Sequence, residues 1–140
     1  MRKFEDSLPL KLLKAREAAM SFFRPMLLEH SITEQQWRVL RALNDVEELE
    51  TRQLADICCI LSPSLTGIIQ RLEQQEFVNR RKSTEDHRRI LVSATPKARK
   101  LMEAIAPQVD ASYRKLTRDL SREKMEQLSK LLDEVSLLKN

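Results

Sequence analysis

The chain has 140 residues, a net charge of +4 and one glycine, Gly67. This length predicts one compact domain with a core of its own, and a lone glycine excludes the glycine-rich loops with which nucleotide-using enzymes cradle phosphate. No apolar run approaches the ~20 residues that span a bilayer, and Lys11, Lys14 and Arg16 interrupt the first one, so we expect no membrane span, no signal peptide and a cytoplasmic protein.

The first predicted element is a long amphipathic helix over about residues 8–30. Apolar side chains recur along it at three- and four-residue spacing and give it one apolar face; they are Leu8, Leu12, Ala15, Ala19, Phe22, Phe23 and Leu27. Proline removes a helical hydrogen bond, so we expect Pro25 to kink this helix near its end.

A capping box marks the start of the second helix. Thr33 followed by Gln36 can satisfy two amides that a helix start otherwise leaves unpaired. The side chains expected to face inward are Trp37, Leu40 and Leu43. The helix is predicted to end near Asn44, before an acidic stretch over residues 45–50.

Two short helices with a tight connection follow. We expect Thr51 to cap the first and Ser62 with Pro63 to start the second. The predicted inward residues are Leu54, Ala55 and Cys58 in the first helix and Leu65, Ile68, Ile69 and Leu72 in the second. Such a pair is typical of a helix-turn-helix, whose second helix reads DNA.

A strand-like pattern begins at Phe77 and Val78. Residues 83–87 form a polar tip, and Ile90, Val92 and Ala94 alternate with Leu91 and Ser93, which predicts a two-stranded hairpin, or wing. Thr95 and Pro96 then start a long helix to about Asp119, with Pro107 as the place where it could bend. Ser121 is expected to cap a last helix that carries Leu128, Leu131, Leu132, Val135 and Leu138 on one face.

This order predicts a mainly α fold with a small β-wing, in a single domain over 1–140. Residues 33–94 form the winged helix-turn-helix, while 1–30 and 96–140 supply dimerisation helices, because their apolar stripes need each other or a second copy of the chain. A symmetric homodimer would place two recognition helices about one helical turn apart on a duplex, so we expect a pseudo-palindromic operator.

The positive charge is concentrated in one segment. Between Arg80 and Lys100 lie eight lysines or arginines and two acidic residues, which gives this segment +6 and leaves −2 for the rest of the chain. Such a cluster attracts phosphate backbones, although a solvated charged face would have the same composition.

The wing sequence Asp86-His87-Arg88-Arg89 resembles the Asp-x-Arg signature of the MarR family of winged helix-turn-helix regulators. Thr95 stands where that signature continues as Leu-Thr-x-x-Gly, with Ala94 and Ala98 replacing Leu and Gly. A closer likeness is to the repressors of homoprotocatechuate (4-hydroxyphenylacetate) degradation operons within this family, carried by the segments at 15–18, 23–25, 33–38, 59–61 and 63–67. The resemblance implies a repressor released by an aromatic carboxylate.

Ten residues are predicted to contact DNA. Short hydroxyls, glutamine and arginine suit base edges in the major groove, a wing arginine oriented by Asp86 suits the minor groove, and the other cations suit phosphate. The set is Arg52, Ser62, Ser64, Thr66, Gln70, Arg71, Lys82, Asp86, Arg88 and Arg89. The alternative is an ordinary solvent-facing helix. Gly67 suggests a close approach, by preference of a neighbouring helix and otherwise of DNA.

An effector site for a small aromatic carboxylate is predicted on the first two helices. Aromatic and methionine side chains can hold a ring while a cation meets its carboxylate. The candidates are Arg16, Met20, Phe23, His30, Trp37 and Arg38. Core packing with an ion pair of Arg16 at a dimer interface is the competing interpretation.

The sequence gives weaker support to other functions. Cys58 and Cys59 raise the alternative of a redox-sensing regulator, but their apolar neighbours favour buried structural thiols. Two distant histidines give no metal-binding spacing, and no catalytic grouping is recognisable, so we expect no metal, no cofactor and no enzyme. A helical protein-interaction adaptor without DNA specificity is a second alternative.

Overall fold

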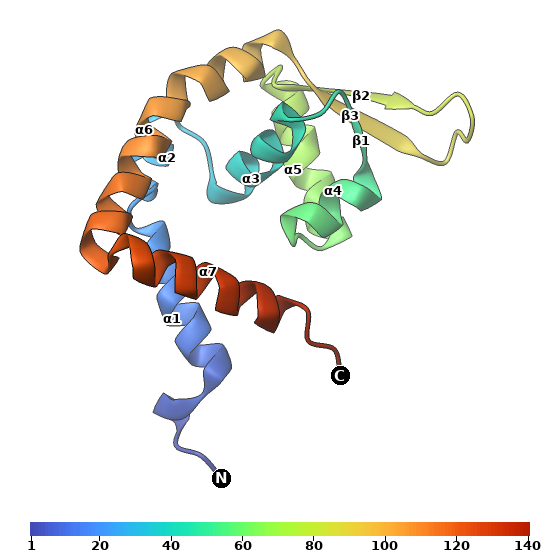
Figure 1. Cartoon of the computed structure of the whole chain (residues 1–140). Coiled ribbons are helices and arrows are strands. Elements are labelled where there is room, and N and C mark those ends of the chain that lie inside the picture. The colour runs from blue at the N-terminus through green and yellow to red at the C-terminus, as the bar shows by residue number, and fades with distance from the viewer. The chain divides into compact units, whose positions relative to one another are not determined.

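The computed structural model describes residues 1–140 as a mainly helical chain with a small antiparallel sheet (Figure 1). The elements are η1 (Phe4–Asp6), α1 (Leu8–Met20), α2 (Arg24–Glu29), α3 (Glu34–Asn44), β1 (Leu49–Glu50), α4 (Thr51–Cys58), α5 (Ser62–Gln74), β2 (Val78–Lys82), β3 (Ile90–Ala94), α6 (Pro96–Leu120) and α7 (Arg122–Ser136). They form two compact units, one of residues 1–25 with 108–140 and one of residues 26–107. None of the helices combines the length and the apolar character that crossing a membrane requires.

The single helix predicted over 8–30 is wrong, because the chain breaks it between α1 and α2. Pro25 is the second residue of α2, where its missing N–H costs nothing. In a continuous helix its ring would clash with the carbonyl of Ser21. The helix therefore breaks upstream of the kink that the sequence predicted. At the break, the Ser21 Oγ donates to the Ala18 carbonyl at 2.6 Å.

The predicted capping box of α3 is confirmed. Thr33 Oγ1 accepts from the Gln36 amide at 3.0 Å, and Gln36 Oε1 accepts from the Thr33 amide at 3.1 Å. Leu40 and Leu43 are fully buried as expected, but Trp37 is only half-buried. Val39 takes a core position instead, because the buried stripe of α3 follows Gln36, Val39, Leu40 and Leu43 at helical spacing.

The helix-turn-helix is present as α4 and α5. The predicted inward residues Leu54, Ala55, Cys58, Leu65, Ile69 and Leu72 are buried, whereas Ile68 is half-buried. Both starts are displaced by one residue from the prediction. Glu50 precedes α4, with its amide donating to Gln53 Oε1 at 3.0 Å, and Leu61 precedes α5.

The predicted wing is confirmed, with an added strand. Strands β2 and β3 pair antiparallel, with Val78 opposite Ala94 and Lys82 opposite Ile90. The sheet has the order β1-β3-β2, so the two-stranded prediction is corrected to three strands. A two-residue strand inside an acidic stretch has too few residues to show a period-2 pattern. Figure 1 shows the β2–β3 hairpin extending from α3, α4 and α5.

Three helices are followed by a residue in the left-handed conformation, which favours glycine, but in each case the residue is not a glycine. A residue just past α2, α4 and α5 has a left-handed backbone: Cys59 (φ 53°) directly follows α4, and Ser31 (φ 56°) and Glu76 (φ 63°) are the second residues after α2 and α5. In each case the next amide donates back across the helix end, in the bonds Ile32 to Leu27, Ile60 to Ala55 and Phe77 to Leu72 at 2.8–3.0 Å. These are Schellman motifs, in which a Cβ costs roughly 1–2 kcal/mol.

The last two helices start as the sequence predicts. Thr95 Oγ1 accepts from the Ala98 amide at 3.2 Å and Ser121 Oγ from the Lys124 amide at 3.2 Å. Helix α6 continues through Pro107 to Leu120. Neither α1 nor α7 buries a side chain within the single chain, so the apolar residues of α7 are left uncovered.

Replacing Cys59 by glycine is expected to raise the free energy of unfolding by about 1 kcal/mol, because the left-handed conformation no longer strains a Cβ. Urea unfolding measures the change. Cys59→Ala is the matched control, since it removes the exposed thiol but keeps the Cβ, and it should stay within about 0.5 kcal/mol of the parent. Equal stability of the glycine and alanine variants would contradict the assigned strain.

Candidate nucleic-acid interface

The face of α5 that the sequence assigned to DNA is open to solvent. Ser62, Ser64, Thr66, Gln70 and Arg71 are all exposed, on the side of the helix away from its buried leucines and isoleucine. Within this face Thr66 Oγ1 donates to the Ser62 carbonyl at 3.2 Å. The helix therefore presents hydroxyls, an amide and a guanidinium outward, which are groups that pair with base edges.

Gly67 lies on the same open face. A Cβ built at this position would meet no atom within 4 Å, so the expected packing of Gly67 against a neighbouring helix is wrong. Gly67 instead borders a shallow hollow of about 260 Å³ together with Ser64 and Arg71. Close approach of DNA to this glycine stays a prediction.

The tip of the wing holds an arginine in a fixed setting. The Asp86 carboxylate accepts from the Arg88 backbone amide at 3.0 Å and from Arg88 Nε at 3.3 Å, which is the contact that the sequence predicted. These two hydrogen bonds lower the pKa of Asp86, the backbone bond more than the side-chain bond. Asp86 therefore stays ionised and orients Arg88, whose side chain is still 92% exposed.

A polar hollow of about 440 Å³ joins the wing tip to the start of α4. Arg52, Arg88 and Arg89 line it together with Glu50 and Asp86. Arg89 Nε lies 3.8 Å from Glu50 Oε1 and 3.9 Å from Asp86 Oδ2. Three guanidinium groups against two carboxylates leave positive charge here, which suits a phosphate.

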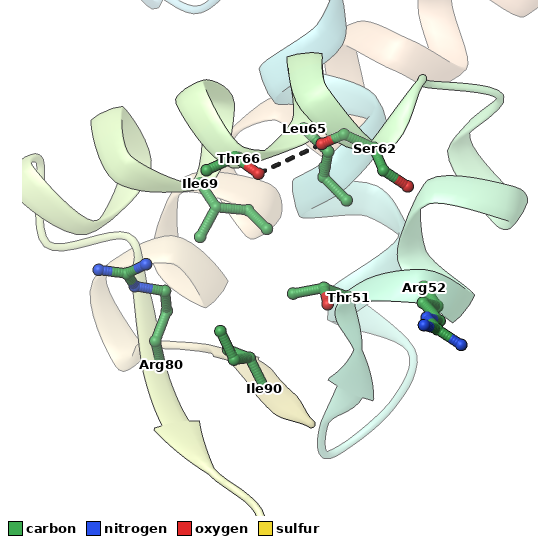
Figure 2. Close-up of a pocket in the computed structure, with 8 residues that line it drawn as sticks. All are labelled: Thr51, Arg52, Ser62, Leu65, Thr66, Ile69, Arg80 and Ile90. Carbon is green, nitrogen blue, oxygen red and sulfur yellow. Dashed lines mark hydrogen bonds between the residues drawn. The ribbon is translucent and has the colours of Figure 1, made fainter. Parts of the chain in front are cut away.

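A second cavity, of about 240 Å³, lies between α4, α5 and the wing (Figure 2). Thr51 and Arg52 come from α4, and Arg80 and Ile90 from the wing strands. The lining residues of α5 are Ser62, Leu65, Thr66 and Ile69. The fold thus brings Arg52 of α4 and Ser62 and Thr66 of α5 around one hollow. Gln70 and Lys82 border neither of these cavities.

Two wing arginines are held by carboxylates, which the charge count could not reveal. Arg80 donates to both Glu73 oxygens at 3.1 and 2.9 Å, and Arg81 to both Glu48 oxygens at 3.1 and 2.6 Å. The hydrogen bond to its glutamate raises the pKa of each arginine. These pairs connect β2 to α5 and to the segment before β1. Their partners are 7 and 33 residues away, so no local pattern predicts the second.

Two further cations of the basic segment close helix ends. Lys97 Nζ donates to the Gln75 carbonyl at 2.7 Å and lies 4.8 Å from the centre of the Phe77 ring. Arg99 donates to the Asn44 carbonyl at 2.9 Å and the Val46 carbonyl at 3.1 Å. The start of α6 therefore satisfies carbonyls at the ends of α5 and α3, positions that favour positive charge.

Three candidate effector residues lie in the first unit. Arg16 is exposed and 3.7 Å from Glu17, Met20 is half-buried, and Phe23 is buried. Phe23 packs edge-to-face on Tyr113 with ring centres 5.1 Å apart. Sequence reasoning missed Tyr113, because it stands among polar residues of α6 and meets Phe23 only through the fold.

The other three candidates, His30, Trp37 and Arg38, belong to the second unit and are half-buried. Arg38 Nη1 donates to the Cys58 carbonyl at 2.7 Å. Part of the Arg38 guanidinium is thus already engaged within the helix-turn-helix.

The two cysteines differ in their exposure to solvent. Cys58 is buried as expected, its thiol donates to the Arg38 carbonyl at 3.5 Å, and burial raises its pKa, which opposes thiolate formation. Cys59 is exposed, so its predicted burial is wrong. As the left-handed residue that ends α4, it leaves the helix face that packs on the core.

Comparisons with known proteins agree with this geometry. The sequence model of the MarR family matches residues 32–90. The homoprotocatechuate degradative operon repressor of Escherichia coli is 43% identical over 135 residues, which cover 96% of this chain and 91% of that repressor. The HTH-type transcriptional regulator FarR of Neisseria gonorrhoeae is 42% identical, over 96% and 92% of the two chains.

Among solved structures, NadR in complex with 4-hydroxyphenylacetate is 41% identical, with a TM-score of 0.83 over 99% of each chain. Identity at this level over nearly the whole of both chains establishes common family and fold. The chain belongs to the MarR family of transcriptional regulators.

Proposed function

We propose that the protein is a homodimeric repressor that binds a pseudo-palindromic operator and is released by a small aromatic carboxylate. The observation that carries the DNA part is the pairing of an open polar face on α5 with an exposed, carboxylate-oriented arginine at the wing tip. In this proposal the protein acts by binding rather than by catalysis, and it works in the cytoplasm, where both DNA and catabolic substrates are present.

Each part of the interface has a distinct role toward DNA. Helix α5 enters the major groove with Ser64, Thr66, Gln70 and Arg71, and Arg88 enters the minor groove, where negative potential favours guanidinium. Phosphate contacts come from Arg52, Ser62, Lys82 and Arg89, which fix the register of the protein on the duplex without reading sequence.

Uncovered apolar side chains support the dimer. Leu128, Leu131 and Leu132 of α7 are 40–57% exposed, and Leu8 and Leu13 of α1 are exposed as well. Apolar stripes of this kind are normally covered by a partner. A second copy of the chain would cover them and would set two α5 helices against successive turns of one duplex face.

The effector assignment rests on the relatives and on the side chains of α1 to α3. NadR is known in complex with 4-hydroxyphenylacetate, and the Escherichia coli relative is named for a homoprotocatechuate operon. Among the candidate residues, Met20, Phe23 and Trp37 are suited to the ring of a hydroxylated phenylacetate, and Arg16, His30 and Arg38 are suited to its carboxylate. Release requires that the ligand bind the DNA-free state more tightly than the operator-bound state.

Selection of bound duplexes from random DNA is the first test. We expect enriched sequences to share an inverted repeat with half-site centres about 10 bp apart, and binding that falls steeply with salt. Recovery of no common sequence would contradict the proposed operator and favour an adaptor without DNA specificity.

Arg88→Ala is expected to weaken operator binding at least tenfold at fixed salt, because it removes the guanidinium from the minor groove. Fluorescence anisotropy with a labelled operator measures the affinity. Arg81→Ala is the matched control: it removes the same charge from the same wing, but Arg81 is held by Glu48, so its effect should stay below threefold. Equal losses in both variants would show that only net charge matters.

Calorimetry is expected to detect binding of 4-hydroxyphenylacetate, and the ligand should lower operator affinity. Trp37→Ala should weaken ligand binding at least fivefold, because a ring loses its stacking partner, while operator binding without ligand stays within threefold. If neither 4-hydroxyphenylacetate nor homoprotocatechuate binds, the effector assignment is wrong and the DNA assignment is unaffected.

A further inference from the structure

We propose that Arg38 is a positioning residue for DNA reading, which holds the turn between α4 and α5 and so sets the direction of the recognition helix. This inference rests on the proposed DNA-binding function of α5. It gives Arg38 a role different from that of an effector ligand.

The contact between Arg38 and the end of α4 is reciprocal. Arg38 Nη1 donates to the Cys58 carbonyl at 2.7 Å, and the Cys58 thiol donates to the Arg38 carbonyl at 3.5 Å. The two residues are 20 positions apart. Helix α3, which carries Arg38, is thereby joined to the last residue of α4 by both backbone and side chain.

The end of α4 needs such a donor. The last carbonyls of a helix have no partner within it. The Schellman motif satisfies two of them, since the Ile60 amide donates to Ala55 at 3.0 Å and the Cys59 amide to Asp56 at 3.3 Å. The Cys58 carbonyl lies beyond this motif, and Arg38 supplies a charge-assisted bond where the helix dipole favours a cation.

The turn has few other supports. Only three residues, 59–61, separate α4 from α5. Cys59 is exposed and carries a left-handed backbone, Leu61 is exposed, and Ile60 alone is buried. Because the turn leads directly into Ser62, any tilt at the end of α4 is passed to the face of α5 that bears Ser64 and Thr66.

An anionic effector that bound Arg38 would have to compete with the hydrogen bond that Arg38 already makes within the protein. Nη1 is committed to Cys58, and the Nε atom is buried without a hydrogen-bond partner. The positioning role and the effector role therefore make opposite predictions for a neutral substitution, which separates them experimentally.

The test measures operator affinity without ligand for the full-length dimer. Arg38→Met, which keeps the aliphatic length but loses the donor, should weaken operator binding at least tenfold and change affinity for a random duplex less than threefold. Arg38→Lys, which still brings a cation to the Cys58 carbonyl, should restore operator affinity to within threefold of wild type. Arg41→Met, from an exposed arginine of the same helix, is the charge-matched control and should stay within threefold.

Amide hydrogen exchange supplies a readout of the turn itself. The Cys59 and Ile60 amides should exchange faster in Arg38→Met than in wild type, while the amides of Leu40 and Leu43 in α3 keep their protection. General destabilisation would instead accelerate both groups together, and that result would overturn the positioning role.

The outcomes separate the two proposals. If wild type selects an operator and Arg38→Met binds it equally well but no longer responds to 4-hydroxyphenylacetate, Arg38 is an effector ligand and the inference is wrong. If wild type selects no duplex, the proposed function itself fails. Should the methionine variant not fold, Arg38→Gln replaces it: the shorter, neutral side chain should bind at least threefold more weakly than Arg38→Lys, and equal affinity overturns the inference.

Discussion

The carbonyl groups at the ends of short helices are the constraint on which the DNA-binding unit depends. Helices α3, α4 and α5 are too short to be stable alone and must pack on one another, which places their ends close to other elements. Cations from elsewhere in the chain satisfy these ends: Arg99 for α3, Arg38 for α4 and Lys97 for α5. Each bond satisfies a helix end and joins it to a neighbouring element. We expect the orientation of the proposed reading surface on α5 to depend on these contacts.

The sequence predicts the starts of helices better than their ends. The caps at Thr33, Thr95 and Ser121 use a side chain and an amide three residues apart, so the signal is local and visible in the sequence. No glycine marks the helix ends in this chain, and the side-chain donors that satisfy their last carbonyls come from 20 to 55 residues away. The first helix shows the same limit. Pro25 predicted a kink, but the helix breaks four residues upstream, because in a continuous helix the Pro25 ring would clash with the Ser21 carbonyl.

The candidate interface likewise contains features that local sequence patterns predict and features that only the tertiary structure reveals. The outward face of α5 and the contact of Asp86 with Arg88 follow from helical periodicity and from a two-residue spacing, and both are present. The neighbours of Arg80, Arg81 and Phe23 are set by tertiary packing, and no sequence pattern identified Glu73, Glu48 or Tyr113 as their partners. Strand β1 was missed because it acquires its conformation from β3 rather than from its own residues.

The ion pairs of Arg80 and Arg81 change the meaning of the charge on the basic segment. A guanidinium that already holds a carboxylate in two hydrogen bonds has fewer N–H donors left for a phosphate and part of its charge compensated, so it displaces fewer counterions from DNA when a complex forms. For the proposed interface we therefore expect the salt dependence of binding to follow Arg52, Arg71 and Lys82, together with the 92% exposed Arg88, more closely than the +6 of the sequence. The formal charge sets the long-range attraction of this surface to DNA, whereas the cations outside the Arg80 and Arg81 ion pairs set how many counterions are released on binding.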